Sequence, residues 1–143
     1  MRPAHRQGLR VWALLPAVLL VLCGLAAGCT SMPSKPAYCT AASQLETSVH
    51  NLGNITVNAN TLSSVRTAVS KVQADAKTFA RDAKSAYPSQ TTALQNSLSS
   101  LDAAVKSASA QPSVAAIAAV VSSVAQVKTA ASNVKSAVKG KCQ

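Results

Sequence analysis

Aromatic residues are nearly missing from this chain: they make up 3% of it, with one Trp, one Phe and two Tyr. Hydrophobic residues nevertheless account for 48%, so Ala and Val must supply most of the buried surface. Gly and Pro are scarce too, with five and six residues, and Ala is the strongest helix former. These proportions favour helices over strands, and the length of 143 residues corresponds to one domain. We therefore predict an all-α protein.

Acidic residues are equally scarce: the chain has four Asp and Glu residues and 14 Lys and Arg residues, which gives a formal net charge of +10 at pH 7. The four carboxylates are isolated from one another in the sequence, at Glu46, Asp75, Asp82 and Asp102. The sequence shows neither a nucleophile with a paired base nor a Gly-rich phosphate loop. We predict that the protein is not an enzyme and needs no cofactor.

Histidine is limited to two residues, and His50 is the only one outside the N-terminal region. A metal or haem site needs several convergent ligands, and no second His, Glu-x-x-His or Cys-x-x-Cys pattern accompanies His50. We predict no metal site.

The longest apolar run lies near the N-terminus, over residues 11–27. Arg2, Arg6 and Arg10 precede it and no acidic residue interrupts it, which is typical of an export signal. The alternative is an uncleaved membrane helix, since the run is at the lower edge of spanning length. In both cases the arginines predict that the remainder of the chain lies outside the cytoplasm.

The apolar run ends in the residues LAAGC, 25–29, which resemble the lipobox of bacterial lipoprotein signals. The resemblance implies a diacylglyceryl group on the Cys29 sulfur and cleavage before Cys29, so that residues 1–28 form the signal peptide. Two acyl chains give stable anchoring. Residues 29–37 contain the lipidated Cys and a segment with Pro and Ser that we interpret as a flexible tether. The expected location is the outer face of a bacterial cell membrane.

Beyond the tether, the clearest pattern is an apolar stripe with alternating steps of three and four residues, which predicts one continuous helix face. The stripe consists of Leu62, Val65, Val69, Val72, Ala76, Phe79, Ala83 and Ala86. Pro88 disfavours helical geometry at Tyr87 and should end this helix. Ser89 is then expected to cap the next helix, by accepting a hydrogen bond from a backbone N–H.

Three further helices are predicted from the same kind of spacing. A shorter one occupies residues 38–52, and one after Pro88 buries Leu94, Leu98, Leu101, Val105 and Ala108. The last begins at Pro112 and Ser113 and ends before Gly140, a residue type common just after helix ends. Its stripe is Ile117, Val120, Val121, Val124, Val127, Ala131, Val134 and Val138. We predict that residues 38–143 form an antiparallel up-down-up-down four-helix bundle.

The four cysteines have different predicted fates. Cys23 leaves with the signal and Cys29 carries the lipid, so Cys39 and Cys142 remain outside the cell, where disulfides form. An antiparallel course of four helices brings the beginning and end of the bundle together, which would place these two within reach of each other. A metal or redox pair is the alternative. We predict a structural disulfide between Cys39 and Cys142.

Basic residues gather on two predicted helix flanks, at about 100° per residue. On the second helix, one flank holds Arg66, Lys77, Arg81 and Lys84, and the opposite flank holds Asp75 and Asp82. On the last helix, Lys128, Lys135 and Lys139 lie beside the apolar stripe. These flanks are either a solvated face or a surface for an acidic protein or an anionic envelope polymer. They lack the interleaved aromatics of nucleic-acid binders, so we expect no nucleic-acid partner.

Residues 38–143 resemble small actinobacterial secreted or lipid-anchored helical proteins, which open with an aromatic-Cys pair such as Tyr38-Cys39 and finish on a Cys such as Cys142. The resemblance implies an architecture and no activity. We predict a membrane-anchored extracytoplasmic lipoprotein that acts as a non-catalytic binding or scaffolding module. The alternatives are a carrier that holds a lipid or other apolar ligand in its core, and an electrostatic binder of anionic envelope polymers.

Overall fold

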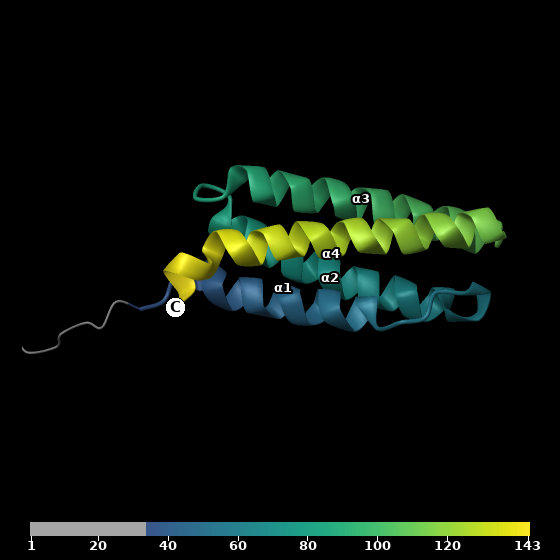
Figure 1. The fold of residues 1–143 in the computed structure, drawn as a ribbon, viewed down its shortest axis with the longest axis horizontal. Coiled ribbons are helices and arrows are strands. Elements are labelled where there is room, and N and C mark those ends of the chain that lie inside the picture. The colour runs from purple at the N-terminus through teal and green to yellow at the C-terminus, as the bar shows by residue number, and fades with distance from the viewer. Residues whose placement is uncertain (1–33) are drawn as a thin grey trace, which may run out of the picture. The chain divides into compact units, whose positions relative to one another are not determined.

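The computed structural model describes residues 34–143, and this part of the chain is all-helical with no strand. Its elements are α1 (Ala37–Gly53), a short 3-10 helix η1 (Ala59–Thr61), α2 (Leu62–Ala83), α3 (Pro88–Ala110) and α4 (Val114–Cys142) (Figure 1). The prediction of an all-α protein with four helices in residues 38–143 is confirmed. Cys23, Cys29 and the predicted signal peptide lie outside the described residues.

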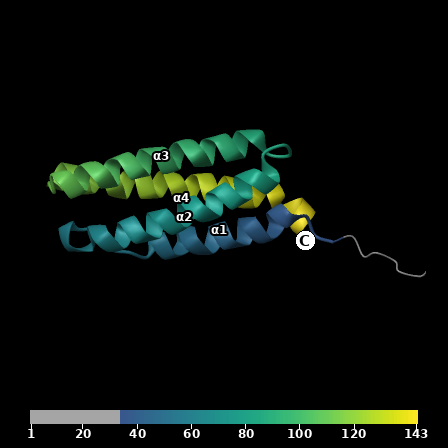
Figure 2. The same cartoon turned by 180° about the vertical axis from the view of Figure 1, so that it is seen from behind.

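The four α-helices pack against one another along their lengths. Both α1 and α3 contact α2 and α4. Figures 1 and 2 show α1 and α3 at opposite edges, with α4 in front of the space between them in one view and α2 in front of it in the other. The helices α2 and α4 therefore lie on opposite faces of the bundle.

The core is built from the predicted apolar stripes. Its largest fully buried side chains include Phe79, Leu45, Leu52, Leu94 and Leu101, and valines and alanines fill the space around them. All five residues predicted to be buried on α3 are buried, as are the predicted stripe residues of α2 from its start to Ala83. The amphipathic spacing therefore identified the faces of α2 and α3 that exclude water.

The junction between α2 and α3 differs from the prediction. Helix α2 ends at Ala83, and the N–H groups of Ala86 and Tyr87 both donate to the Ala83 carbonyl oxygen, at 3.0 and 2.8 Å. Ala86 is exposed and does not join the core stripe. Pro88 is the first residue of α3, a position where its missing N–H removes no helical hydrogen bond. Ser89 lies inside the helix, so its predicted role as the cap was wrong.

The two ends of α4 show one correct and one wrong prediction. At its start, the Ser113 side chain accepts a hydrogen bond of 3.1 Å from the Ala116 N–H, as expected for a cap. At its end, the helix continues through Gly140 to Cys142. Helical geometry costs Gly only about 0.5–1 kcal/mol relative to Ala, so the helix passes through Gly140 and carries Cys142 onto α1.

The predicted stripe of α4 also needs a correction. Val121 is 50% exposed, whereas Ser123 and Ala130, which were not assigned to the stripe, are buried. Ile117 and Ala131 are only partly buried. Adjacent residues on a helix point about 100° apart, so Val120 faces the core and Val121 cannot.

Candidate anion-binding groove

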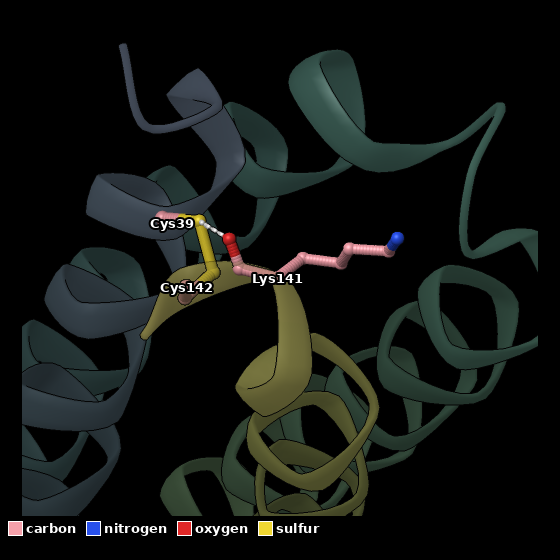
Figure 3. Close-up of a disulfide and its surroundings, with 3 residues drawn as sticks. All are labelled: Cys39, Lys141 and Cys142. Atoms are coloured by element: carbon pink, nitrogen blue, oxygen red, sulfur yellow. Dashed lines mark hydrogen bonds between the residues drawn. A yellow bond between two sulfur atoms is a disulfide. The ribbon is translucent and has the colours of Figure 1, made fainter. Parts of the chain in front are cut away.

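The first turn of α1 and the last turn of α4 are joined by a disulfide between Cys39 and Cys142 (Figure 3). The two sulfur atoms are 2.08 Å apart and the Cα atoms 5.5 Å apart. The Cys39 Sγ also lies 3.9 Å from the Lys141 carbonyl oxygen. A disulfide sulfur has no proton to donate, so this contact reflects close packing. The disulfide fixes one end of the seam between α1 and α4.

A groove follows this seam and contains two cavities. The cavity nearest the disulfide has a volume of about 460 Å³ and the next about 420 Å³. Glu46 and Lys135 line both of them. The ionisable side chains along the groove are Lys35, Glu46, His50, Lys128, Lys135 and Lys139. We call this feature the α1–α4 groove.

One ion pair crosses the groove. The Lys135 Nζ donates to the Glu46 Oε1, and the side chains are 62% and 50% exposed respectively. Exposed ion pairs contribute little stability, typically about 0–1 kcal/mol. Lys135 can therefore leave Glu46 for another carboxylate or phosphate without a large loss of stability.

The Lys128 side chain packs against the end of α1 at Gly53, where no side chain stands in its way. A Cβ atom placed on Gly53 would lie 3.3 Å from the Lys128 Cδ and 3.5 Å from its Nζ. The aliphatic stem of Lys128 thus covers the last turn of α1 while its ammonium group reaches water. A positive charge there is favourable because the C-terminal end of a helix carries partial negative charge.

The groove therefore combines four lysines with a single acidic side chain. Three of the lysines, Lys128, Lys135 and Lys139, belong to the flank predicted on α4. The fourth, Lys35, and the partner Glu46 were not assigned to this surface by sequence reasoning. The spacing of Glu46 and His50, four residues apart on α1, is the signal that could have revealed a matching polar flank there.

The basic residues predicted on α2 form a separate group. Arg66, Lys77, Arg81 and Lys84 are all exposed, on the bundle face opposite α4. The predicted separation of Arg81 from the acids was wrong: Arg81 Nε donates to Asp82 Oδ1 at 2.8 Å. This hydrogen bond and the adjacent negative charge raise the pKa of Arg81. The seven predicted residues therefore make two sets, and the α4 set borders the α1–α4 groove.

The seam between α3 and α4 provides a comparison. Its two cavities are lined entirely by uncharged residues, mostly Ala, Ser, Asn and Gln. Positive charge is therefore a property of the α1–α4 groove in particular and not of every seam along α4.

The acidic and metal-ligating side chains do not assemble into a site. Within residues 34–143, no three His, Cys, Asp or Glu side chains gather at a distance suited to a metal ion. Asp75 is the most buried carboxylate, and Lys71 Nζ donates to its Oδ1 at 2.5 Å, while its Oδ2 is buried without a partner. Helix α4 is the one described helix that is long and apolar enough to span a membrane, and seven of its residues are buried in the bundle.

Comparisons were made with family models, with curated proteins and with solved structures. None of the three finds a match to this chain.

Proposed function

We propose that the protein is a non-catalytic binding module whose α1–α4 groove holds an extended anionic chain. The observation that carries this proposal is the arrangement of Lys35, Lys128, Lys135 and Lys139 along one groove whose single acidic side chain is Glu46. Lysine is a compact point charge on a flexible stem. A row of lysines can therefore bind a polymer with repeating negative charges without recognising a particular sequence in it. The carboxylates of an acidic protein and the charges of an anionic envelope polymer share this chemistry.

The proposal includes an antiparallel up-down-up-down course of the four helices. Helix α3 has 23 residues and a length of about 35 Å at 1.5 Å per residue. The links from Ala83 to Pro88 and from Ala110 to Val114 reach at most about 3.5 Å per residue, which is too short to return along a helix. Each link therefore favours a reversal of direction, and a bond between the start of α1 and the end of α4 agrees with three reversals.

We further propose that the module is held at the outer face of a bacterial membrane by a lipid on Cys29. The lipobox resemblance of residues 25–29 supports the anchor. The disulfide supports an oxidising compartment outside the cytoplasm. Residues 29–37 would then form the tether that leads to α1.

The anchor is tested by the intact mass of the protein extracted from membranes, for the wild type and for Cys29→Ala. We expect the wild type to begin at a diacylated Cys29, and the variant to keep its uncut N-terminus. A wild-type protein of full uncut mass would refute the lipoprotein assignment, and the membrane-helix alternative would replace it.

The groove is tested by the binding of fluorescent polyglutamate and fluorescent polyphosphate to the detergent-solubilised protein. Replacing Lys128, Lys135 and Lys139 together by Gln should weaken binding of the true ligand class strongly, and added salt should weaken it further because screening shortens electrostatic attraction. A matched control removes the same charge from α2, with Arg66, Lys77 and Arg81 replaced by Gln. Equal losses in both variants would show attraction to net charge alone and would refute the groove.

The carrier alternative predicts an apolar ligand retained between the helices. Phe79, Leu45 and Leu101 fill the interior that this ligand would need. Native mass spectrometry of the purified protein tests the carrier: a retained lipid supports it, and a mass without ligand counts against it.

A further inference from the structure

One end of the bundle brings together residues from four separate segments. The disulfide joins the start of α1 to the end of α4. Close to it, the rings of Tyr38 and Tyr87 meet edge to face with centroids 5.3 Å apart, which joins the start of α1 to the start of α3. The turn of residues 84–86 leads directly into Tyr87. We call this region the disulfide end.

Four lysines belong to the segments that meet at the disulfide end. Lys35 precedes α1, Lys84 lies in the turn after α2, and Lys139 and Lys141 are in the last turn of α4. Figure 3 shows the Lys141 side chain extending away from the disulfide and from α1. Hydrogen bonding with Tyr38 and the loss of hydration raise the pKa of Tyr87, and the positive charge of Lys141 opposes them.

The acids near this end are already paired with other residues. Asp82 pairs with Arg81, and Glu46 pairs with Lys135. Within the described part of the chain, none of the four lysines of the disulfide end takes part in an ion pair. Their charges are therefore available to an external anion.

The opposite end of the bundle contains no such cluster of charge. Residues 47–65 and 107–127, which form the far ends of the helices and their connections, include no Asp, Glu, Lys or Arg. Val114, at the start of α4, is 90% exposed there. The bundle thus has one cationic end with two aromatic phenols, whereas the segments of the opposite end carry no Asp, Glu, Lys or Arg of their own and meet one lysine, Lys128, at Gly53.

We propose that the disulfide end docks onto the headgroups of an anionic lipid bilayer. Clusters of four to eight basic residues recognise anionic membrane surfaces, and tyrosine rings favour the headgroup level, where one edge is apolar and the other is wet. The chain also enters the bundle at this end, through Lys35. The inference rests on the proposed membrane attachment, since a tether at this end would hold the cluster close to the bilayer.

The test uses the full-length protein reconstituted into vesicles of phosphatidylcholine alone or with phosphatidylglycerol. Flotation first establishes that the protein is attached to both kinds of vesicle. Lysine labelling with an amine-reactive reagent, read by mass spectrometry, then measures each side chain. We expect Lys84 and Lys141 to react several-fold more slowly on anionic vesicles, and Lys71 and Lys106 to react at unchanged rates. High salt should abolish the difference, because the attraction is screened.

A pair of matched variants separates docking from general charge. Lys84→Gln with Lys141→Gln should remove the protection of Lys35 on anionic vesicles, whereas Lys71→Gln with Lys106→Gln should leave it intact. If Lys84 and Lys141 react at the same rate on anionic vesicles as on phosphatidylcholine alone, the proposal is overturned, whether that shared rate is fast or slow. Loss of flotation would instead refute the membrane attachment. Lys84 and Lys141, whose labelling decides the proposal, do not line the α1–α4 groove, whereas Lys35 and Lys139 belong to both surfaces.

Discussion

Phe79 is the largest fully buried side chain of a core that otherwise consists of leucines, valines and alanines. It is the only Phe in the chain, and its side chain is completely buried on α2. Phe79→Ala should leave a cavity that Ala and Val neighbours cannot fill, because close-packed interiors relax only in part. We expect a loss of about 3–5 kcal/mol in the free energy of unfolding, measured by urea denaturation.

The control for Phe79 is Val114, a hydrophobic residue whose side chain is 90% exposed. Val114→Ala should change the free energy of unfolding by no more than about 0.5 kcal/mol, as for ordinary surface positions. Similar losses in the two variants would mean that burial of the Phe79 side chain contributes no more to the free energy of unfolding than an exposed side chain does.

Tyr87 links the stability of the fold to alkaline pH. Hydrogen bonding with Tyr38, and then loss of hydration, raise the pKa of Tyr87 above its ordinary value of 10.0. The folded state thus favours the protonated phenol, so the stabilisation is complete below pH 10.0 and is lost as pH rises through the folded-state pKa. We expect the free energy of unfolding to fall less steeply with alkaline pH in Tyr87→Phe than in wild type.

Denaturation at a series of alkaline pH values checks this difference. The two proteins differ only in the phenol of residue 87, so the difference between the two slopes reports on the Tyr38–Tyr87 pair. Identical slopes would show that the phenol ionises equally readily in the folded and unfolded states.

At the scale of the helices, Ser113 and Ser89 provide a matched pair. The Ser113 side chain accepts a hydrogen bond from Ala116 at the start of α4, whereas α3 begins at Pro88 with no side-chain cap. Ser113→Ala should cost about 1 kcal/mol, and Ser89→Ala should cost almost nothing because no capping bond is lost. Thermal or urea denaturation of the two variants measures both values. A larger loss for Ser89→Ala would reassign the start of α3.

Gly140 offers a stabilising change in α4. It lies inside the helix, and a Cβ atom there would meet no other atom within 4 Å. Gly140→Ala should raise the free energy of unfolding by about 0.5–1 kcal/mol, because Ala has less conformational freedom to lose. At Gly53 the added Cβ would lie 3.3 Å from the Lys128 Cδ, so Gly53→Ala should give a smaller gain or none. Equal gains would contradict the packing of Lys128 on α1.

The helices of this protein could be predicted from sequence where a single periodic pattern decided their buried face. The leucines of α3 have that pattern, and all of them are buried. Helix ends were less predictable because two local interpretations compete: Pro88 can stop one helix or begin the next, and Gly140 can follow a helix or lie within it. Gly140 lies within α4, which continues to Cys142 and its disulfide with Cys39. That disulfide is a long-range contact, which local sequence patterns do not predict.

The groove shows the same limit at a larger scale. The lysine flank of α4 follows from helical spacing alone. The pairing of Lys135 with Glu46 joins residues 89 positions apart, and it depends on which face of α1 lies beside α4. Spacing along one helix does not determine that choice, so Lys35 and Glu46 could be added only from the structure.

For the whole molecule, the Cys39–Cys142 disulfide closes a loop of 103 positions, nearly the entire helical unit. The chain-entropy model assigns such a loop a stabilisation of about 4–5 kcal/mol, largely through restriction of the unfolded chain. Small domains have total stabilities of about 5–15 kcal/mol. Replacing both cysteines by Ala should therefore remove a large share of the stability, measured as a lower urea midpoint.

The double variant also tests whether the disulfide shapes the α1–α4 groove as well as stabilising the chain. The bond is in one of the two groove cavities, and it holds the first turn of α1 against the last turn of α4. Without it, Lys35 and Lys139 at this end should spread apart, and polyanion binding should weaken even at temperatures where the variant is fully folded. A variant that loses stability but binds as tightly as wild type would limit the disulfide to restricting the unfolded state. Wild type treated with reductant should change in the same direction in both measurements, because it also lacks the covalent link between the two helices while keeping both thiols.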